Sequence, residues 1–247
     1  MQTAHRITQL WRYPIASIGG ENVSSANIGT EGILGDRTHG LFDATSGTPA
    51  APEKDRRWHK ALMLSATSAS SVIPLIHFPD GSVLSVEDDR TCAYLSDYFG
   101  FHVGIGRVDP NSGLQRYPLI EHRHKHFPLH VLTAGSLGFL AKLQGVAKVD
   151  VRRFRPNVLL EREMIIEDEP SFEETLWVGH HARIGSVSLA IEDEATRCGI
   201  TIIPQPGIED DPEVLRTILR KNRRRFGAYC SVEKAGTLAL GDRFELI

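Results

Sequence analysis

The sequence predicts an α+β protein in which a β-rich barrel or sandwich carries a few helices. Short apolar runs separated by Gly, Pro, Asn and Asp dominate the first eighty residues, which is typical of strands joined by turns. Only three segments combine helical spacing of apolar residues with a capping residue or a stop residue. With 247 residues, the chain can bury a core without disulfides and form one or two domains.

In the first half, one helix is expected among the strands. Asp88 or Asp89 is a candidate N-cap for this helix, and Gly100 is its expected end. The polar stretch 49–59 is predicted to be a loop. Strands are predicted over residues 7–13, 21–28, 41–43, 61–65 and 83–86.

The second half contains the other two predicted helices. Ser136 is the expected N-cap of the first, which ends at Gly145, and Asp211 with Pro212 opens the second. Strands are predicted over residues 129–133, 155–160, 187–191, 227–232 and 238–246.

Composition excludes several classes of protein. The chain has 28 Lys and Arg against 31 Asp and Glu, a net charge of −3, and 41% hydrophobic residues. These values argue against a disordered protein and against nucleic acid as the main partner. No run of 18 apolar residues and no signal-peptide core is present, so we expect a cytoplasmic protein with no membrane association.

The three cysteines, Cys92, Cys198 and Cys230, are odd in number and far apart in the sequence. Considered singly, each is expected to be a reduced, buried thiol. Cys92 is predicted on the apolar side of a helix and Cys230 within a strand. Cys198 differs because Arg197 precedes it, and a neighbouring positive charge favours the thiolate.

Three segments combine Arg with a turn or a strand entrance: residues 35–37, 152–157 and 196–198. Guanidinium groups held near exposed backbone N–H groups suit a phosphate or another anion. If the segments converge, they form a site for an anion beside a reactive thiol. Spacing alone does not decide whether they meet.

Two further clusters have alternative interpretations. His122, His124, His126 and His130 can bind a metal if the segment is extended, but a solvated loop or edge strand is the favoured interpretation. The basic run 220–225 follows a predicted helix, where cations suit the helix dipole. A solvated face is favoured there over a docking site.

The chain resembles the MOSC-domain family, the molybdenum cofactor sulfurase C-terminal domain proteins. Similar motifs occur in order along nearly the whole chain: LWRYPIAS (10–17), GDR (35–37), FRPN (154–157), FEE (172–174), TRC (196–198), FGAY (226–229) and GTLALGD (236–242). The resemblance implies a β-rich barrel MOSC fold with a smaller N-terminal β-barrel region. It implies the N-terminal region over residues 1–100 and the MOSC domain over 101–247.

The resemblance also implies a pterin-dithiolene molybdenum cofactor, molybdopterin, in a cleft between the two β-rich parts. Cys198 matches the family's ligand to molybdenum and is the expected catalytic residue. The residues implied to contact the cofactor are Ser17 and Arg37 at its terminal phosphate, and Arg153, Arg155, Asn157 and Arg197 around the remainder.

Relatives of this kind include the amidoxime-reducing components, which remove oxygen from N–OH groups. The resemblance therefore implies an oxidoreductase acting on a small N-hydroxylated substrate, with electrons from a separate donor protein. One departure concerns Ala16, where such relatives often have Lys, and Lys54, Arg56 or Arg57 is a candidate replacement cation. If the segment 124–128, HKHFP, borders the cleft, the pocket is more cationic and aromatic than in those relatives, and an anionic substrate is expected.

Two other functions remain open at this point. The chain is a carrier of the cofactor, or of sulfur on Cys198, in the first alternative. In the second, the scaffold has lost the cofactor and its His-rich segment supplies acid–base groups.

Overall fold

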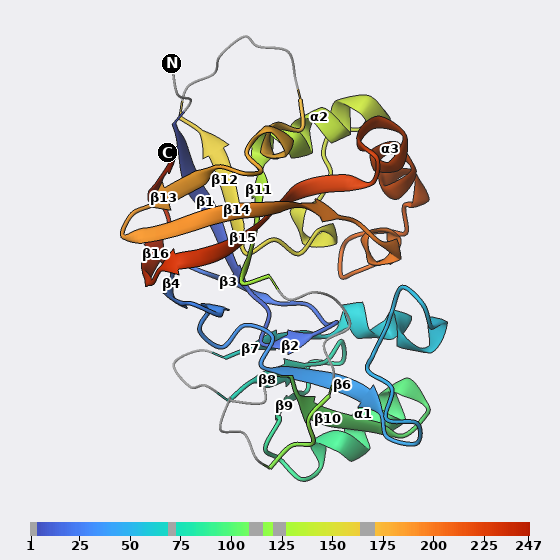
Figure 1. Cartoon of the computed structure of the whole chain (residues 1–247). Coiled ribbons are helices and arrows are strands. Elements are labelled where there is room, and N and C mark those ends of the chain that lie inside the picture. Colours follow the sequence, from blue (N-terminus) through green and yellow to red (C-terminus); the bar gives the residue numbers. More distant parts are fainter. Residues whose placement is uncertain (1–3, 69–72, 109–115, 121–126, 164–170) are drawn as a thin grey trace.

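The structure is a computed structural model that describes residues 4–68, 73–108, 116–120, 127–163 and 171–247. Figure 1 shows a barrel with two flanking helices in its upper part and a smaller β-rich part below. The α+β class and the β-rich barrel predicted from the sequence are confirmed.

The barrel is closed by a pairing between strands that are far apart in the sequence. Strands follow the order β12-β11-β15-β14-β13-β17-β1-β3, and an additional β1–β12 pairing closes the first seven. Their bounds are β1 His5–Arg12, β3 Glu21–Val23, β11 Leu129–Thr133, β12 Val158–Arg162, β13 His181–Ile184, β14 Val187–Thr196, β15 Arg225–Lys234 and β17 Arg243–Leu246. Alternating apolar residues such as Leu160, Leu189 and Ile191 fill its core.

Smaller elements complete this upper part. Helices α2 (Ala134–Gln144) and α3 (Pro212–Asn222) cover a second core around Phe154 and Phe226. A three-stranded sheet combines β4 (Ser25–Gly29), β5 (Gly32–Ile33) and β16 (Gly236–Ala239). The 3-10 turn Val151–Arg153 precedes β12, Glu173–Leu176 lies between β12 and β13, and Gly199–Ile202 lies between β14 and α3.

The lower part packs two small sheets around the core of Trp58, Leu95 and Ile105. Its sheets are β10-β6-β2 and β7-β8-β9. The strand bounds are β2 Ile15–Ala16, β6 His39–Asp43, β7 Ser65–Thr67, β8 Leu75–His77, β9 Val83–Ser85 and β10 Val103–Arg107. This part also contains helix α1 (Thr91–Phe99) and a 3-10 helix (Arg56–Met63).

The chain passes between the two parts more than once. Strands β1 and β3 belong to the barrel sheet, whereas β10, after residue 100, pairs with β6 of the lower part. A domain boundary at residue 100 stays a prediction. No helix among the described residues is both long and apolar enough to cross a membrane.

Several local predictions are corrected. Residues 61–63 belong to a 3-10 helix, because Trp58, Ala61 and Leu62 form a buried face at helical spacing and Asp55 caps the first turn; the strand begins at Ser65. Within the predicted loop 49–59, this helix begins at Arg56.

The predicted helix caps are corrected in two of three helices. Thr133 caps α2, since its hydroxyl accepts the N–H of Ser136, which was the predicted cap. Asp88 accepts the N–H of Arg90 but lies outside α1. Asp211 caps α3 as predicted. Cys92 is exposed rather than on the buried side of α1.

Candidate functional site

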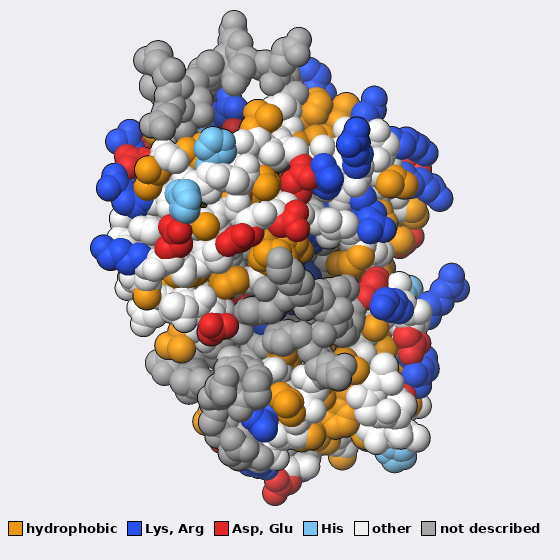
Figure 2. All heavy atoms as spheres, in the orientation of Figure 1, with side chains coloured by type: hydrophobic (Ala, Val, Ile, Leu, Met, Phe, Trp, Pro, Cys, Tyr) orange, Lys and Arg blue, Asp and Glu red, His pale blue; other side chains and the backbone are white. Residues whose placement is uncertain are grey.

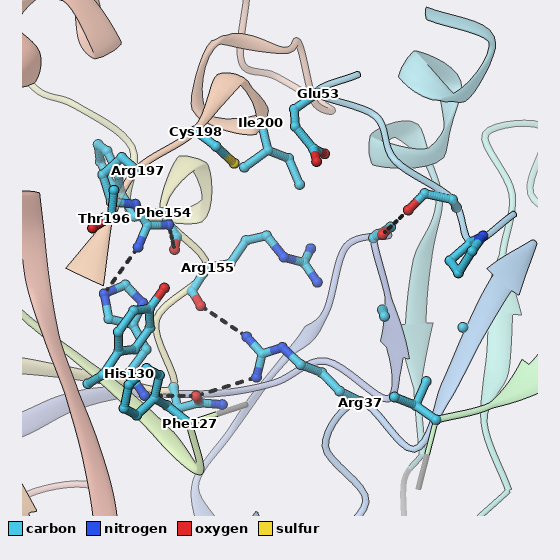
Figure 3. A pocket seen from close by; sticks show the side chains of 18 of the residues that line it. Arg37, Glu53, Phe127, His130, Phe154, Arg155, Thr196, Arg197, Cys198 and Ile200 are labelled. Carbon is cyan, nitrogen blue, oxygen red and sulfur yellow. Dashed lines mark hydrogen bonds between the residues drawn. The ribbon is translucent and has the colours of Figure 1, made fainter. Parts of the chain in front are cut away.

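A cavity of about 440 Å³ lies between the barrel and the lower part, within the size range of small-molecule sites. Figure 3 looks into this cavity. Six of the seven residues predicted for the site line it: Ser17, Arg37, Arg155, Asn157, Arg197 and Cys198. The structure therefore brings residues 35–37, 152–157 and 196–198 together, the question that spacing left open.

Arg37 and Arg155 are held over one buried aromatic ring. Their guanidinium carbons lie 5.0 Å and 4.2 Å from the centre of the Tyr13 ring. Both arginines have left-handed backbone, with φ of 51° and 53°. Burial lowers the pKa of Arg155 to about 10, so this side chain is still charged at neutral pH. Burial raises the pKa of Tyr13, which stays neutral. Two fixed cations thus face the cavity.

Asp36 and Asn157 fasten these arginines to the barrel. The Asp36 carboxylate accepts the Tyr13 N–H at 2.7 Å, the Asn157 side-chain amide at 3.2 Å, and a bond from Arg37. The carbonyl oxygen of the Asn157 side chain accepts the N–H of His130 at 3.1 Å. Asn157 therefore joins β1, β11 and the 35–37 turn, and its side chain is largely engaged in positioning its neighbours.

Arg197 forms the third cation of this wall and is 6% exposed. It donates to the Phe154 carbonyl at 2.7 Å and lies 3.5 Å from Nε2 of His130. Burial and the charges of Arg197 and Arg37 hold the pKa of His130 well below its usual value, so this imidazole is neutral. Among the described residues, Nε of Arg197 has no hydrogen-bond partner. A buried donor of this kind is costly unless a ligand satisfies it.

A second part of the lining, with Asp193, Glu194 and Cys198, comes from β14 and the loop that follows it, which also carries Arg197. Register shifts between Ile191 and Asp193 and between Glu194 and Thr196 interrupt the alternation of β14 against β15. Asp193 and Glu194 therefore both line the cavity, although neighbours in a regular strand point to opposite faces. Glu194 is paired with Arg225 at 2.6 Å.

Cys198 is the cysteine that lines the cavity and is partly exposed. Its carbonyl accepts the N–H and hydroxyl of Thr201 at 3.2 Å and 3.0 Å, which anchors the 3-10 turn Gly199–Ile202. In Figure 3 the sulfur lies toward Ile200 and Glu53, away from the guanidinium of Arg197. In contrast, burial raises the pKa of Cys230 to about 12, so that thiol stays protonated.

Arg153 is the predicted site residue that does not line the cavity. Its guanidinium donates to the carbonyl of Thr201, in the turn that follows Cys198, at 3.1 Å and to that of Glu209 at 2.6 Å. Arg57, a candidate to replace the cation missing at Ala16, is instead paired with Asp43 and Asp55. Ser17 donates to the Ala50 carbonyl at 3.0 Å and has left-handed backbone, with φ of 69°.

For the remaining lining, the sequence pointed to Phe127, within segment 124–128, but not to the acidic residues. Phe127 and Tyr229 stack with ring centres 4.6 Å apart beside His130. Glu53, Asp193 and Glu194 supply carboxylates, so among the described lining residues the site is not uniformly cationic. His122, His124 and His126 lie outside the described residues. Within the described part of the chain, no three His, Cys, Asp or Glu side chains are placed to hold a metal.

The match to a known family covers half of the chain. The sequence profile of the MOSC domain matches residues 118–245. The chain belongs to the MOSC domain family. The match includes Asn157, Arg197 and Cys198 on the cavity wall.

Individual relatives also match about half of the chain. Mitochondrial amidoxime reducing component 2 of Rattus norvegicus is 33% identical over 129 residues, which are 47% of this chain and 35% of the rat protein. The protein of the same name from Bos taurus is 30% identical over 128 residues, 47% of this chain and 35% of that protein. The match thus spans about a third of the length of these curated relatives.

A solved structure supports the fold. The YUAD protein of Bacillus subtilis superposes with a TM-score of 0.50 over 100% of this chain and 97% of that one, at 13% sequence identity. At this identity, the likeness concerns the fold alone.

Proposed function

We propose that the cavity binds a pterin-dithiolene molybdenum cofactor and that the protein reduces small N-hydroxylated molecules. The observation that carries the proposal is the pairing of a partly exposed thiol with three clustered guanidinium groups in one cavity. A thiolate is a soft ligand suited to a sulfur-bound metal, and the guanidiniums suit an anionic phosphate. The relatives named amidoxime reducing components support the same activity.

The residues fit this cofactor on grounds internal to the structure. The buried Nε of Arg197 lacks a partner among the described residues, and a ligand oxygen would satisfy it. Arg37 and Arg155 are already held in place by Tyr13, so little side-chain entropy is lost when an anion binds. Cys198 would hold the metal, while Ser17 and Arg37 would hold the phosphate.

When bound, the cofactor would supply a redox-active metal for the removal of the oxygen atom from an N–OH group. The overall reaction consumes two electrons and two protons, converts R–NHOH to R–NH2, and releases water. Arg197 and the neutral His130 keep one wall polar, and the stacked Phe127 and Tyr229 offer a flat apolar surface to a planar substrate. The electrons come from a separate donor protein in this proposal.

The test is reduction of benzamidoxime by protein expressed in a host that makes the cofactor, with reduced methyl viologen as the donor. We expect conversion to benzamidine, and a loss of about 100-fold or more in Cys198→Ser. Cys92→Ser, at an exposed site on α1, is the control and is expected to retain full activity. Stoichiometric molybdenum without any reduction would instead favour a carrier of the cofactor. Absence of molybdenum from the wild-type protein would refute both functions.

A further inference from the structure

A basic surface with an apolar centre covers the C-terminal end of α3. We define the α3 patch as Leu219, Arg220, Lys221, Arg223 and Arg224, all of which are exposed. Figure 2 shows Lys and Arg side chains gathered over this part of the molecule, to the upper right. The patch is local, since the whole chain has a net charge of −3.

The charges of the α3 patch are mostly not neutralised. Arg220 has one carboxylate partner, Glu213, at 3.5 Å. Within the described residues, no ion pair joins Lys221, Arg223 or Arg224 to a carboxylate. A cluster of unpaired cations produces a positive potential that attracts an acidic surface.

Two residues of the α3 patch, Arg223 and Arg224, have a backbone conformation that arginine rarely adopts. Arg223 and Arg224 have φ of 49° and 72°, the left-handed region in which Gly and Asn are preferred. The chain nevertheless has two arginines there. Both N–H groups are directed to the Ile218 carbonyl, which fixes the turn and projects the arginines from the end of the helix.

Exposed leucines give the patch the character of a protein interface. Leu219 is 55% exposed among the arginines. Leu176, 74% exposed, lies on the turn that a hydrogen bond between Asn222 and Thr175 joins to the end of α3. An apolar centre with a charged rim is typical of protein contacts and not of a surface that follows a line of phosphates.

Hydrogen bonds and an ion pair connect the α3 patch to the part of the cavity lining that contains Cys198. The carbonyl of Arg224 accepts the N–H of Arg197 at 2.8 Å, and Cys198 is the next residue. Arg225 is paired with Glu194, which lines the cavity. A short path of covalent and hydrogen bonds therefore joins the patch to the site.

We infer that the α3 patch is the docking surface for a small acidic redox protein that delivers electrons to the cavity. The inference rests on the proposed reductase function, because that reaction consumes two electrons per turnover. Complexes between electron-transfer proteins have small interfaces that depend on charge, and the α3 patch is a small charged surface of this kind. The favoured interpretation of run 220–225 as a solvated face is replaced by this proposal.

Binding of flavodoxin, an acidic flavin protein, tests the surface without any need for turnover. By calorimetry at low salt, the wild type is expected to bind, and about 300 mM salt should weaken binding by about tenfold or more. The triple change K221E/R223E/R224E should weaken it by about 30-fold. The control R183E/K234E/R243E has the same change in charge, with Lys234 about 30 Å from Arg225 along β15, and should leave the affinity within about twofold.

A second variant guards against misfolding of the triple mutant. Leu219→Ser keeps every charge and is expected to weaken flavodoxin binding by about fivefold with an unchanged melting temperature. Equal losses in both triple variants, or no wild-type binding at low salt, would overturn the docking surface. Tighter binding of a DNA duplex than of flavodoxin would overturn it as well.

Kinetics separate this inference from the proposed function. With reduced methyl viologen as the donor, benzamidoxime reduction by K221E/R223E/R224E should match the wild type, whereas the KM for flavodoxin should rise by about tenfold or more. If methyl viologen drives no reduction, the reductase proposal fails, and the binding result still decides whether the surface docks an acidic protein.

Discussion

The two walls of the cavity are built in different ways. Arg37, Arg155 and Arg197 form what we call the fixed wall, because their side chains are held by Tyr13, Asn157 and a backbone carbonyl. Asp193, Glu194 and Cys198 form an open wall, which is partly exposed and comes from the interrupted strand β14 and the loop after it, the loop that also carries Arg197. We therefore expect the fixed wall to hold a bound anion and the open wall to admit molecules from solution.

The largest expected effect comes from crowding the fixed wall. Gly227 has φ of 89°, and a Cβ there would lie 2.3 Å from Nε2 of His130. Gly227→Ala should therefore lower the free energy of unfolding by about 2 to 4 kcal/mol, measured by urea denaturation. Gly207→Ala is the matched control, because Gly207 has φ of 73° but open space around it, and should cost about 1 kcal/mol. Equal losses would show that His130 is free to move.

Removing one cation of the fixed wall should weaken anion binding. Arg155→Ala should reduce the affinity of the cofactor-free protein for pyrophosphate by about 1.5 to 3 kcal/mol, measured by calorimetry. Arg153→Ala is the comparison, since Arg153 donates to the carbonyl of Thr201 and does not line the cavity. Its affinity should stay within about threefold of the wild type. An equal loss in both variants would contradict the assignment of the anion to the lining arginines.

This pair of arginines also shows how far sequence reasoning reaches. Arg-containing turns predicted three segments of the site, because turn-forming residues such as Gly35 and Pro156 and the guanidiniums beside them are visible as residue types. The direction of each side chain is not visible. Arg153 and Arg155 are two residues apart, yet the 3-10 turn sends Arg153 toward Glu209 while the left-handed backbone of Arg155 directs it to the cavity.

The positions of Asp193 and Glu194, the closure of the barrel and the helix at residues 61–63 could not be predicted from the sequence. Asp193 and Glu194 share a face only because β14 loses register against β15, and no periodicity in the sequence marks that shift. The barrel was predictable as a β-rich unit, whereas its closure depends on β1 meeting β12, a contact about 150 residues apart. Residues 61–63 showed an apolar run too short to separate strand from helix.

The lower part offers a pH test that is independent of the fixed wall. His39 is 1% exposed, and burial lowers its pKa to about 4. Since the unfolded chain binds a proton near pH 6.5 and the folded chain does not, the stabilisation is complete above that pH and is lost as the pH falls toward 4. At pH 5.5 the loss is about 1.4 kcal/mol relative to pH 8. In urea denaturation, His39→Gln should lose less free energy of unfolding than the wild type between pH 8 and pH 5.5. An identical loss would mean that another buried histidine, such as His130, causes the effect.

The smallest expected effect comes from adding a cation to the cavity. Ala16 lines it, and Ala16→Lys should raise pyrophosphate affinity by about 0.5 to 1 kcal/mol in the same calorimetric assay. Lys148 is exposed and does not line the cavity, so Lys148→Ala serves as the control and should change nothing. Unchanged affinity in Ala16→Lys would mean that Arg37 and Arg155 already complete the anion site.

The central claim is that Cys198 of the open wall binds the metal of a cofactor that the fixed wall holds. X-ray absorption spectroscopy of protein from a cofactor-competent host tests it most directly. We predict about one molybdenum per chain, with one sulfur ligand fewer in Cys198→Ser than in the wild type and no change in Cys230→Ser. An equal number of sulfur ligands in wild type and Cys198→Ser, or a wild-type protein without molybdenum, would contradict the account.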